Sequence, residues 1–256
     1  MKQDRRCLDA ACRGWLLASL LAVPLALRAS EGPLVLKVRH DHAIGGCQGT
    51  LTLDDSGVRY ETQDKEDARS WSYEDIKQFQ VENKSRITVY TYEDRRWRLG
   101  ADKPFQFDWQ DTEVSPRQVY EFLRTRTRRP IAAWIVPQEP GAVLYEFPVK
   151  HLRSVTGSQG RLVFTEQFVV LESDRPEQSR TWRYEDLEGI ASAGLYDLAL
   201  TTYEQQSLHY AARRVYNFQL QQPLAAETYD SLWRFVNRQK GLELFGGQGP
   251  RERIRE

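Results

Sequence analysis

Cysteine is scarce in this sequence, and its placement excludes a disulfide bond within most of the chain. Of the three cysteines, Cys7 and Cys12 lie in an N-terminal segment that we expect to be removed, which leaves Cys47 alone. A single cysteine cannot form an intramolecular bridge. The fold is therefore expected to depend on core packing, for which seven Trp, twelve Tyr and ten Phe provide apolar area.

The sequence also has no excess of charge of either sign. The whole chain carries 36 basic and 36 acidic side chains, of which residues 1–29 hold five and two. The remaining 31 basic and 34 acidic side chains give a net charge of −3. Proteins that bind polyanions gain affinity by neutralising phosphates and usually show a basic excess. The balance therefore argues against a nucleic-acid partner.

Recognisable catalytic motifs are absent as well. The sequence contains no Gly-x-Ser-x-Gly nucleophile elbow, no glycine-rich phosphate loop and no His-Glu-x-x-His pattern. Carboxylates are plentiful, but their spacing marks no pair as an acid and base couple. We expect a protein that is not an enzyme and that uses no cofactor.

The sequence has one long apolar run, residues 14–27, and it is shorter than the roughly 20 residues that a membrane-spanning helix needs. Basic residues precede it and the small Ala29 follows it, as in a secretory signal peptide. We therefore expect an exported protein, periplasmic or secreted, that loses residues 1–29. The alternative is that this segment remains as a membrane anchor.

An internal repeat organises the rest of the sequence. Three segments recur at a constant offset of 111 positions, with no gap between about residue 38 and residue 107: 48–51 as 159–162, 71–76 as 182–187 and 91–93 as 202–204. A constant offset in three separate clusters is not expected by chance. It predicts two copies of one small domain.

Each copy is predicted to begin with several short strands. Apolar and polar residues alternate over short stretches, and Asp-Asp-Ser-Gly at 54–57 is typical of a hairpin turn. Among the expected strands, one centres on Trp97 and Leu99 and a separate one on Phe105 and Phe107. In the second copy, a strand is expected around Leu208 and Tyr210.

One amphipathic helix is predicted to close each copy. Ser115 can cap the first helix and Pro116 suits its first turn. Apolar residues then recur at helical spacing in both copies: Val119, Phe122 and Leu123 in the first, and Tyr229, Leu232, Trp233 and Val236 in the second. We expect the domains at 33–127 and 142–241, a semi-rigid linker at 128–141, and a disordered tail at 242–256. The linker holds an apolar patch around Trp134, which either packs between the domains or starts the second sheet.

Three sequence patterns resemble bacterial pleckstrin-homology-like (PH-like) and GRAM-type domains. They are Gly-x-Leu-x-Leu at 49–53, Gly-Val-x-Tyr at 57–60 and Trp-Ser-Tyr-Glu-Asp-Ile at 71–76. The resemblance covers nearly all of the mature chain, twice. It implies a mainly β, α+β fold of two tandem small β-barrel or sandwich domains, each closed by a C-terminal helix, that serves as a binding or scaffolding module with a protein partner.

The resemblance does not extend to lipid headgroups. Members that bind phosphoinositides carry Lys and Arg in the first hairpin, whereas this chain has Asp54 and Asp55 there, and Glu166 in the second copy. Acidic residues repel a phosphate. A phosphoinositide ligand is therefore not expected.

One group of residues suggests a metal site. His40 and His42 share a face if they lie on a strand, and Cys47 can fold back toward them across two glycines. These are ligands that zinc and copper accept. The alternatives are a structural histidine bound to the backbone beside a small buried thiol, and a reactive thiol. The second copy keeps only His151 of the three.

The most repeated element surrounds Trp71 and Trp182. We interpret it as part of a structural core, and the alternative is an aromatic binding platform. The expected core residues are Trp71, Tyr73, Trp182, Tyr184, Phe122 and Trp233.

A basic run ends the first predicted helix: Arg124, Arg126, Arg128 and Arg129. Cations are favoured at a helix C-terminus, which suffices to explain them. The alternative is a contact with a membrane surface or an acidic partner, and with an uncleaved leader such a contact describes a peripheral membrane protein.

Overall fold

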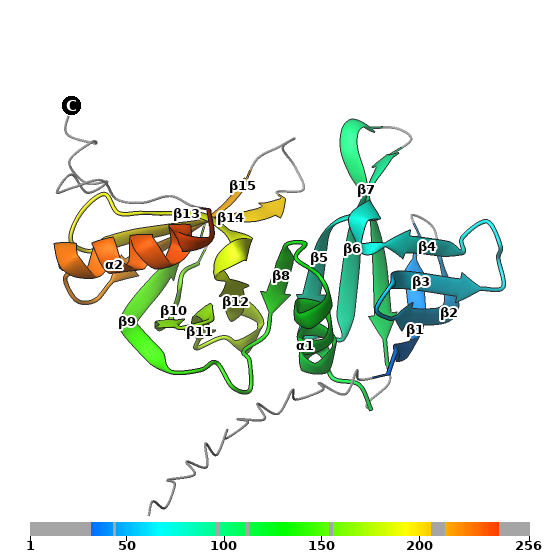
Figure 1. Ribbon diagram of the computed structural model, residues 1–256, viewed down its shortest axis with the longest axis horizontal. Coiled ribbons are helices and arrows are strands. Elements are labelled where there is room, and N and C mark those ends of the chain that lie inside the picture. Colours follow the sequence, from blue (N-terminus) through cyan, green and yellow to red (C-terminus); the bar gives the residue numbers. More distant parts are fainter. Residues whose placement is uncertain are drawn as a thin grey trace, which may run out of the picture. The chain divides into compact units, whose positions relative to one another are not determined.

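The computed structural model describes residues 32–42, 45–95, 98–110, 113–153, 156–205 and 213–240 (Figure 1). The expected signal at 1–29 and tail at 242–256 lie outside these residues, as do Trp97 and the strand predicted around Leu208 and Tyr210. None of the helices within the described ranges is long and apolar enough to cross a membrane.

The first half consists of seven strands followed by a helix. The strands are β1 (Leu34–Asp41), β2 (Gly46–Leu53), β3 (Gly57–Thr62), β4 (Arg69–Ser72), β5 (Ile76–Glu82), β6 (Arg86–Arg95) and β7 (Arg98–Trp109), with the 3-10 turn η1 (Tyr73–Asp75) before β5. Helix α1 (Pro116–Arg126) follows, and Ser115 caps it as predicted by accepting a hydrogen bond from the Gln118 amide.

The second half has the same order of elements. After β8 (Ile131–Trp134) come β9 (Val143–Leu152), β10 (Ser158–Thr165), β11 (Phe168–Ser173), the 3-10 turn η2 (Pro176–Gln178), β12 (Arg180–Arg183), the 3-10 turn η3 (Tyr184–Asp186), β13 (Leu187–Ala191), β14 (Asp197–Gln205), β15 (Arg213–Leu220), α2 (Ala226–Asn237) and the 3-10 turn η4 (Arg238–Lys240). The bounds of β3 and β11, of β4 and β12, and of η1 and η3 each differ by 111 positions. The two helices begin 110 positions apart.

All described strands belong to one fifteen-stranded sheet in the order β13-β14-β15-β9-β10-β11-β12-β8-β5-β6-β7-β1-β2-β3-β4. The fold is mainly β with two α-helices, as predicted. The sheet is not closed, because β13 and β4 end it. Within each half the strands follow one order, the fourth strand at one edge and the fifth at the other.

The stretch predicted as two strands between Trp97 and Trp109 forms the single strand β7 from Arg98 onward. It pairs with β6 from Arg86 opposite Asp108 to Arg95 opposite Arg98. The β6–β7 pairing shifts register after Tyr90. This irregularity interrupts the alternation of apolar residues, which is why the sequence suggests two separate strands.

Strand β8 lies inside the range predicted to be a linker. It pairs in parallel with β5, where Phe79 lies opposite Ile131, and in antiparallel with β12, where Thr181 lies opposite Ala133. Ile131 and Ala133 are each 1 % exposed. Of the expectations for this apolar patch, packing between the domains describes these residues, because their backbone is hydrogen-bonded between β5 and β12.

A buried ion pair holds this junction together. Arg183 binds Asp186 with Nη2 2.8 Å from Oδ1, and its Nη atoms also donate to the carbonyls of Thr127 and Arg129. Asp186 accepts in turn from the amide of Ile131 at 3.0 Å. Paired and hydrogen-bonded charges of this kind are tolerated in a protein interior.

The two halves also share apolar packing. The core of the first half includes three residues of the second half: Val163, Phe168 and Val170. The ring of Phe168 lies 6.4 Å from that of Tyr120 on α1. These three side chains lie on the face of their strands opposite to the second core, so the two cores are not separate.

Candidate functional site

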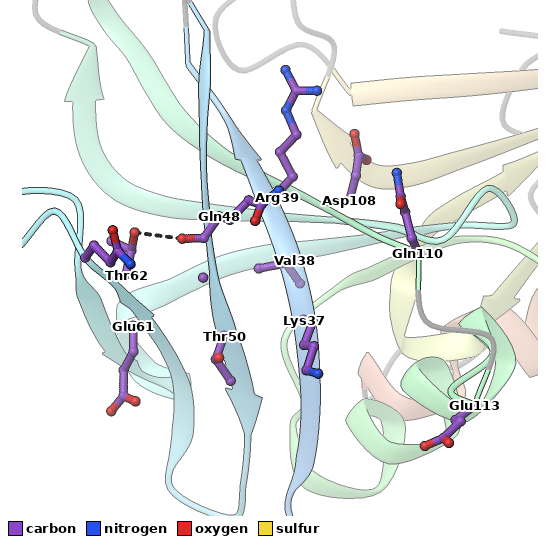
Figure 2. Close-up of a pocket in the computed structure, with 12 residues that line it drawn as sticks. Lys37, Val38, Arg39, Gln48, Thr50, Glu61, Thr62, Asp108, Gln110 and Glu113 are labelled. Carbon is purple, nitrogen blue, oxygen red and sulfur yellow. Dashed lines mark hydrogen bonds between the residues drawn. The ribbon is translucent and has the colours of Figure 1, made fainter.

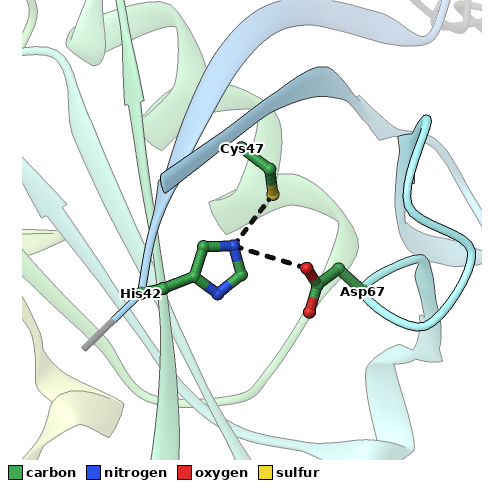
Figure 3. A group of neighbouring side chains, drawn as sticks. All are labelled: His42, Cys47 and Asp67. Carbon is green, nitrogen blue, oxygen red and sulfur yellow. Dashed lines mark hydrogen bonds and ion pairs between the residues drawn. The ribbon is translucent and has the colours of Figure 1, made fainter. Parts of the chain in front are cut away.

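The candidate site lies at the turn end of the β1–β2 hairpin, where three side chains face one another (Figure 3). In the register of the hairpin, His40 pairs with Cys47, so both point to the face that also holds His42. His42 Nε2 lies 3.0 Å from Cys47 Sγ. The structure thus brings His42 and Cys47 together across the turn.

The third member is Asp67, which the sequence analysis did not select. Its Oδ2 lies 3.4 Å from His42 Nε2, and the candidate ligand atoms of His42, Cys47 and Asp67 all fall within 4.8 Å of one another. Asp67 belongs to the connection between β3 and β4. Acidic side chains in that connection, opposite a His and Cys hairpin, were the only available signal.

His40 was expected to share the metal site, but it lies outside this group. Its Nδ1 lies 2.8 Å from the carbonyl oxygen of Gln106, and its ring packs 4.9 Å from that of Phe107. Burial lowers its pKa. The structural histidine bound to the backbone, one of the predicted alternatives, therefore describes His40, whose ring supports His42 at 4.7 Å.

Tyr60 completes the surroundings of Cys47. Its hydroxyl oxygen lies 2.9 Å from Cys47 Sγ. Burial raises the pKa of Tyr60, so this hydroxyl stays protonated and can donate to the sulfur.

The geometry favours a cation held by all three side chains over a nucleophilic relay. In a catalytic relay the carboxylate binds one imidazole nitrogen and the nucleophile binds the other. Here both Cys47 and Asp67 face Nε2 of His42 (Figure 3). The three atoms thus converge on one point, where they can hold a cation between them.

The equivalent place in the second half has different chemistry. At an offset of 111, Arg153, Ser158 and Gln178 stand where the first half has His42, Cys47 and Asp67. Ser158 and Gln178 are buried, and Ser158 Oγ and Gln178 Oε1 have no hydrogen-bond partner among the described residues. Burial, together with the charges of Arg153, Arg180 and Arg214, lowers the pKa of His151 to about 4.

A second candidate surface is an open polar trough across the outward face of the first half (Figure 2). Lys37 and Arg39 of β1 line it together with Thr50 of β2, and Glu61 and Glu113 contribute the opposite charge. The rest of the lining is Val38, Gln48, Gly49, Thr62, Gln63, Asp108 and Gln110.

In the second half this face is crossed by ion pairs. Arg161, which stands at the position of Thr50, lies 3.0 Å from Glu146 and also pairs with Glu172. The small Thr50 leaves the middle of the first half's face open, whereas Arg161 spans it in the second. The outward faces of the two halves therefore differ in their side chains, although their strands have the same order.

The predicted basic run is largely engaged within the protein. Arg126 binds Asp55 with Nε 2.7 Å from Oδ1, and Arg124 binds Glu121. Arg129 donates to the carbonyls of Tyr73 and Glu74, and Arg128 is exposed. Most of these cations are therefore not presented as an open patch.

The residues predicted to form the core are mostly inaccessible. Trp71, Trp182, Tyr184 and Phe122 are buried, while Tyr73 and Trp233 are partly buried and pack against the two cores. The indole nitrogens of Trp71 and Trp182 donate to Glu93 and Glu204. Neither indole presents a flat ring to solvent.

Comparison with known proteins yields no family. No protein-family model matches the chain, and no curated protein matches its sequence.

Three solved structures show weak similarity to this chain. The C-terminal domain of an unknown protein from Leishmania infantum is 14% identical, with a TM-score of 0.29 over 37% of this chain and 84% of that one. The linker-DH/PH domains of p115-RhoGEF are 12% identical (TM-score 0.27, 40% of this chain and 30% of that one). The Spt16D Pob3N heterodimer is 9% identical (TM-score 0.31, 67% and 84%). Similarity at this level identifies neither function nor family.

Proposed function

We propose that this chain is an exported, non-catalytic binding or scaffolding protein in which two copies of a PH-like fold act as one body. The repeated order of seven strands and one helix supports the duplication, as do the bounds that differ by 111 positions. Strand β8 and the buried pair of Arg183 and Asp186 support the single body. The protein thus offers a fixed spacing between two surfaces.

The trough on the first half is the observation that carries the binding role. Strand β1 provides two cations, Lys37 and Arg39, while Glu61 and Glu113 add anions at other points of the lining. A phosphate-rich surface is disfavoured by these carboxylates. The fitting partner is a protein segment that carries both charges, and electrostatic complementarity of this kind sets specificity and the rate of association.

Site-specific crosslinking tests this role. A photo-crosslinking amino acid at Thr50 is expected to capture a partner from native envelope extract, and one at Arg161 in the second half serves as the matched control. The double variant Lys37→Glu and Arg39→Glu should abolish the adduct at position 50, because it reverses both cations of β1. An equal adduct from position 161, or one at position 50 that survives the charge reversal, would contradict the proposal.

A further inference from the structure

We propose that His42, Cys47 and Asp67 form a binding site for one divalent transition-metal ion of the zinc class. The three side chains come from three segments: the residue after β1, the start of β2 and the connection between β3 and β4. Their ligand atoms nevertheless meet within 4.8 Å. Imidazole nitrogen, thiolate sulfur and carboxylate oxygen are the three ligand types that zinc accepts in proteins.

Two of the three separations between ligand atoms fit a metal ion with little movement, and the third, from Cys47 to Asp67, is within 4.8 Å. Zinc bonds of about 2.3 Å to sulfur and 2.0–2.2 Å to nitrogen or oxygen, arranged as a tetrahedron, place the ligand atoms roughly 3.3–3.6 Å apart. The distance from His42 Nε2 to Asp67 Oδ2 is 3.4 Å, and that from Nε2 to Cys47 Sγ is 3.0 Å. An opening of roughly half an ångström between nitrogen and sulfur accommodates the ion.

The charges also suit a divalent cation. A neutral imidazole, a thiolate and a carboxylate supply two negative charges, which a doubly charged ion neutralises. The thiol of Cys47 releases its proton to solvent when the metal–sulfur bond forms. Second-sphere contacts are present, since the Tyr60 hydroxyl lies 2.9 Å from the sulfur and the His40 ring supports His42.

The site is accessible from solvent. The side chains of His42 and Asp67 are 28% and 32% exposed. Three protein ligands leave one tetrahedral position for water or for a ligand from outside, as in metal sites that remain open. The proposed metal thus lies where an external ligand can reach it.

The second half provides an internal contrast. Arg153 places a permanent cation where His42 supplies a nitrogen ligand, and Ser158 replaces the thiol. Neither is a suitable zinc ligand. We therefore infer one metal ion per chain, bound by the first half.

Titration of the purified mature chain tests the proposal. With Zn²⁺ in competition against a chromogenic chelator, we expect one ion per chain bound at micromolar or lower free zinc. With Co²⁺, we expect a thiolate-to-cobalt charge-transfer band. Cys47→Ser should remove the band and weaken zinc binding by more than about 100-fold, and Tyr60→Phe should weaken it by about tenfold.

The controls separate a three-ligand site from a lone reactive thiol. His42→Asn and Asp67→Asn should each weaken zinc binding while the thiol remains, and Ser158→Ala in the second half should have no effect. Circular dichroism of each variant checks that it is folded. Zinc binding unchanged in both His42→Asn and Asp67→Asn, or no stoichiometric binding by the unmodified chain, overturns the proposal.

Discussion

Residues at equivalent positions of the two halves keep the same backbone but differ in chemistry. His42 corresponds to Arg153, and Thr50 to Arg161. Each replacement introduces a cation into the second half where the first has a neutral or titratable group. As a result, the candidate metal site and the polar trough both belong to the first half, and the second half gathers positive charge around His151.

The buried His151 predicts a loss of stability in acid. Its pKa is lowered from 6.5 to about 4, chiefly by burial, so between these values the unfolded chain binds the proton and the folded chain does not. The free energy of unfolding is therefore complete above about pH 6.5 and falls by about 3 kcal/mol as the pH drops to about 4.

Urea unfolding at several pH values checks this prediction. In His151→Gln the decline between pH 6.5 and 4 should be smaller by about that amount, because glutamine does not titrate in this range. A variant whose stability falls as steeply as that of the unmodified protein would show that His151 is not the group responsible.

The sequence could predict part of the candidate site. Alternation on a strand places His40 and His42 on one face, and the two glycines suggest the return of Cys47. Asp67 is 20 positions further on in a connection between strands, so its approach depends on how the β2–β3 and β3–β4 pairings fold back, which periodicity does not specify. His40 lies outside the candidate site because its ring nitrogen is hydrogen-bonded to the carbonyl oxygen of Gln106, which is far away in the sequence.

At the scale of elements, strand β8 changes the relation between the halves. The sequence predicts a linker at 128–141 whose apolar patch either packs between the domains or starts the second sheet. In the structure, the apolar residues Ile131–Trp134 form β8, which pairs with the edges of β5 and β12. Short strands with few residues carry little periodic signal, so only the structure shows that this segment continues the sheet.

The ion pair at this junction predicts a large effect of one substitution. Asp186→Asn removes the buried counter-charge of Arg183 and leaves it only the partly exposed Glu185, 2.5 Å from Nη1. Breaking a buried pair costs about 3–5 kcal/mol, and because Glu185 remains we expect the lower end of this range. The matched control is Asp75→Asn at the equivalent, exposed position in η1, which should change stability little. Chemical denaturation of both variants provides the measurement, and equal effects would contradict a special role for the junction.

The arginines at the end of α1 predict weak membrane binding by the mature chain. Arg124 and Arg126 are paired with Glu121 and Asp55, and Arg129 binds carbonyl oxygens. In sedimentation with vesicles that contain phosphatidylserine, the mature chain should remain in the supernatant at physiological salt. Co-sedimentation that is lost when Arg128 is changed to Glu would instead support the peripheral membrane alternative.

At the scale of the whole molecule, the shared packing predicts one cooperative unfolding transition. Trp182→Ala and Trp71→Ala each empty a large buried site and should cost about 3–5 kcal/mol. Because Val163, Phe168 and Val170 pack into the first core, both variants should shift the same transition in a thermal melt. Two resolved transitions in either variant would indicate that the halves unfold independently.

Export remains a prediction from the sequence alone. If residues 1–29 are a signal peptide, N-terminal sequencing of the native protein should begin near Ser30. Soluble cytoplasmic protein that retains Met1 would exclude it.

The junction between the halves joins two different surfaces, the β5 edge of one half and the β12 edge of the other. A head-to-tail contact of this kind does not close on itself, and repeated between molecules it would generate a filament. The side chains at the two free ends of the sheet do not match this contact, so they do not support a filament. Thr52, Gly57 and Arg59 of the first half stand where the second half carries Val163, Phe168 and Val170. Counted from the helix N-caps, Asp230 of α2 stands where α1 has Tyr120. The sequence differences between the two halves thus allow them to pack against each other within one chain. The same differences oppose the equivalent contact between chains, and with it polymerisation.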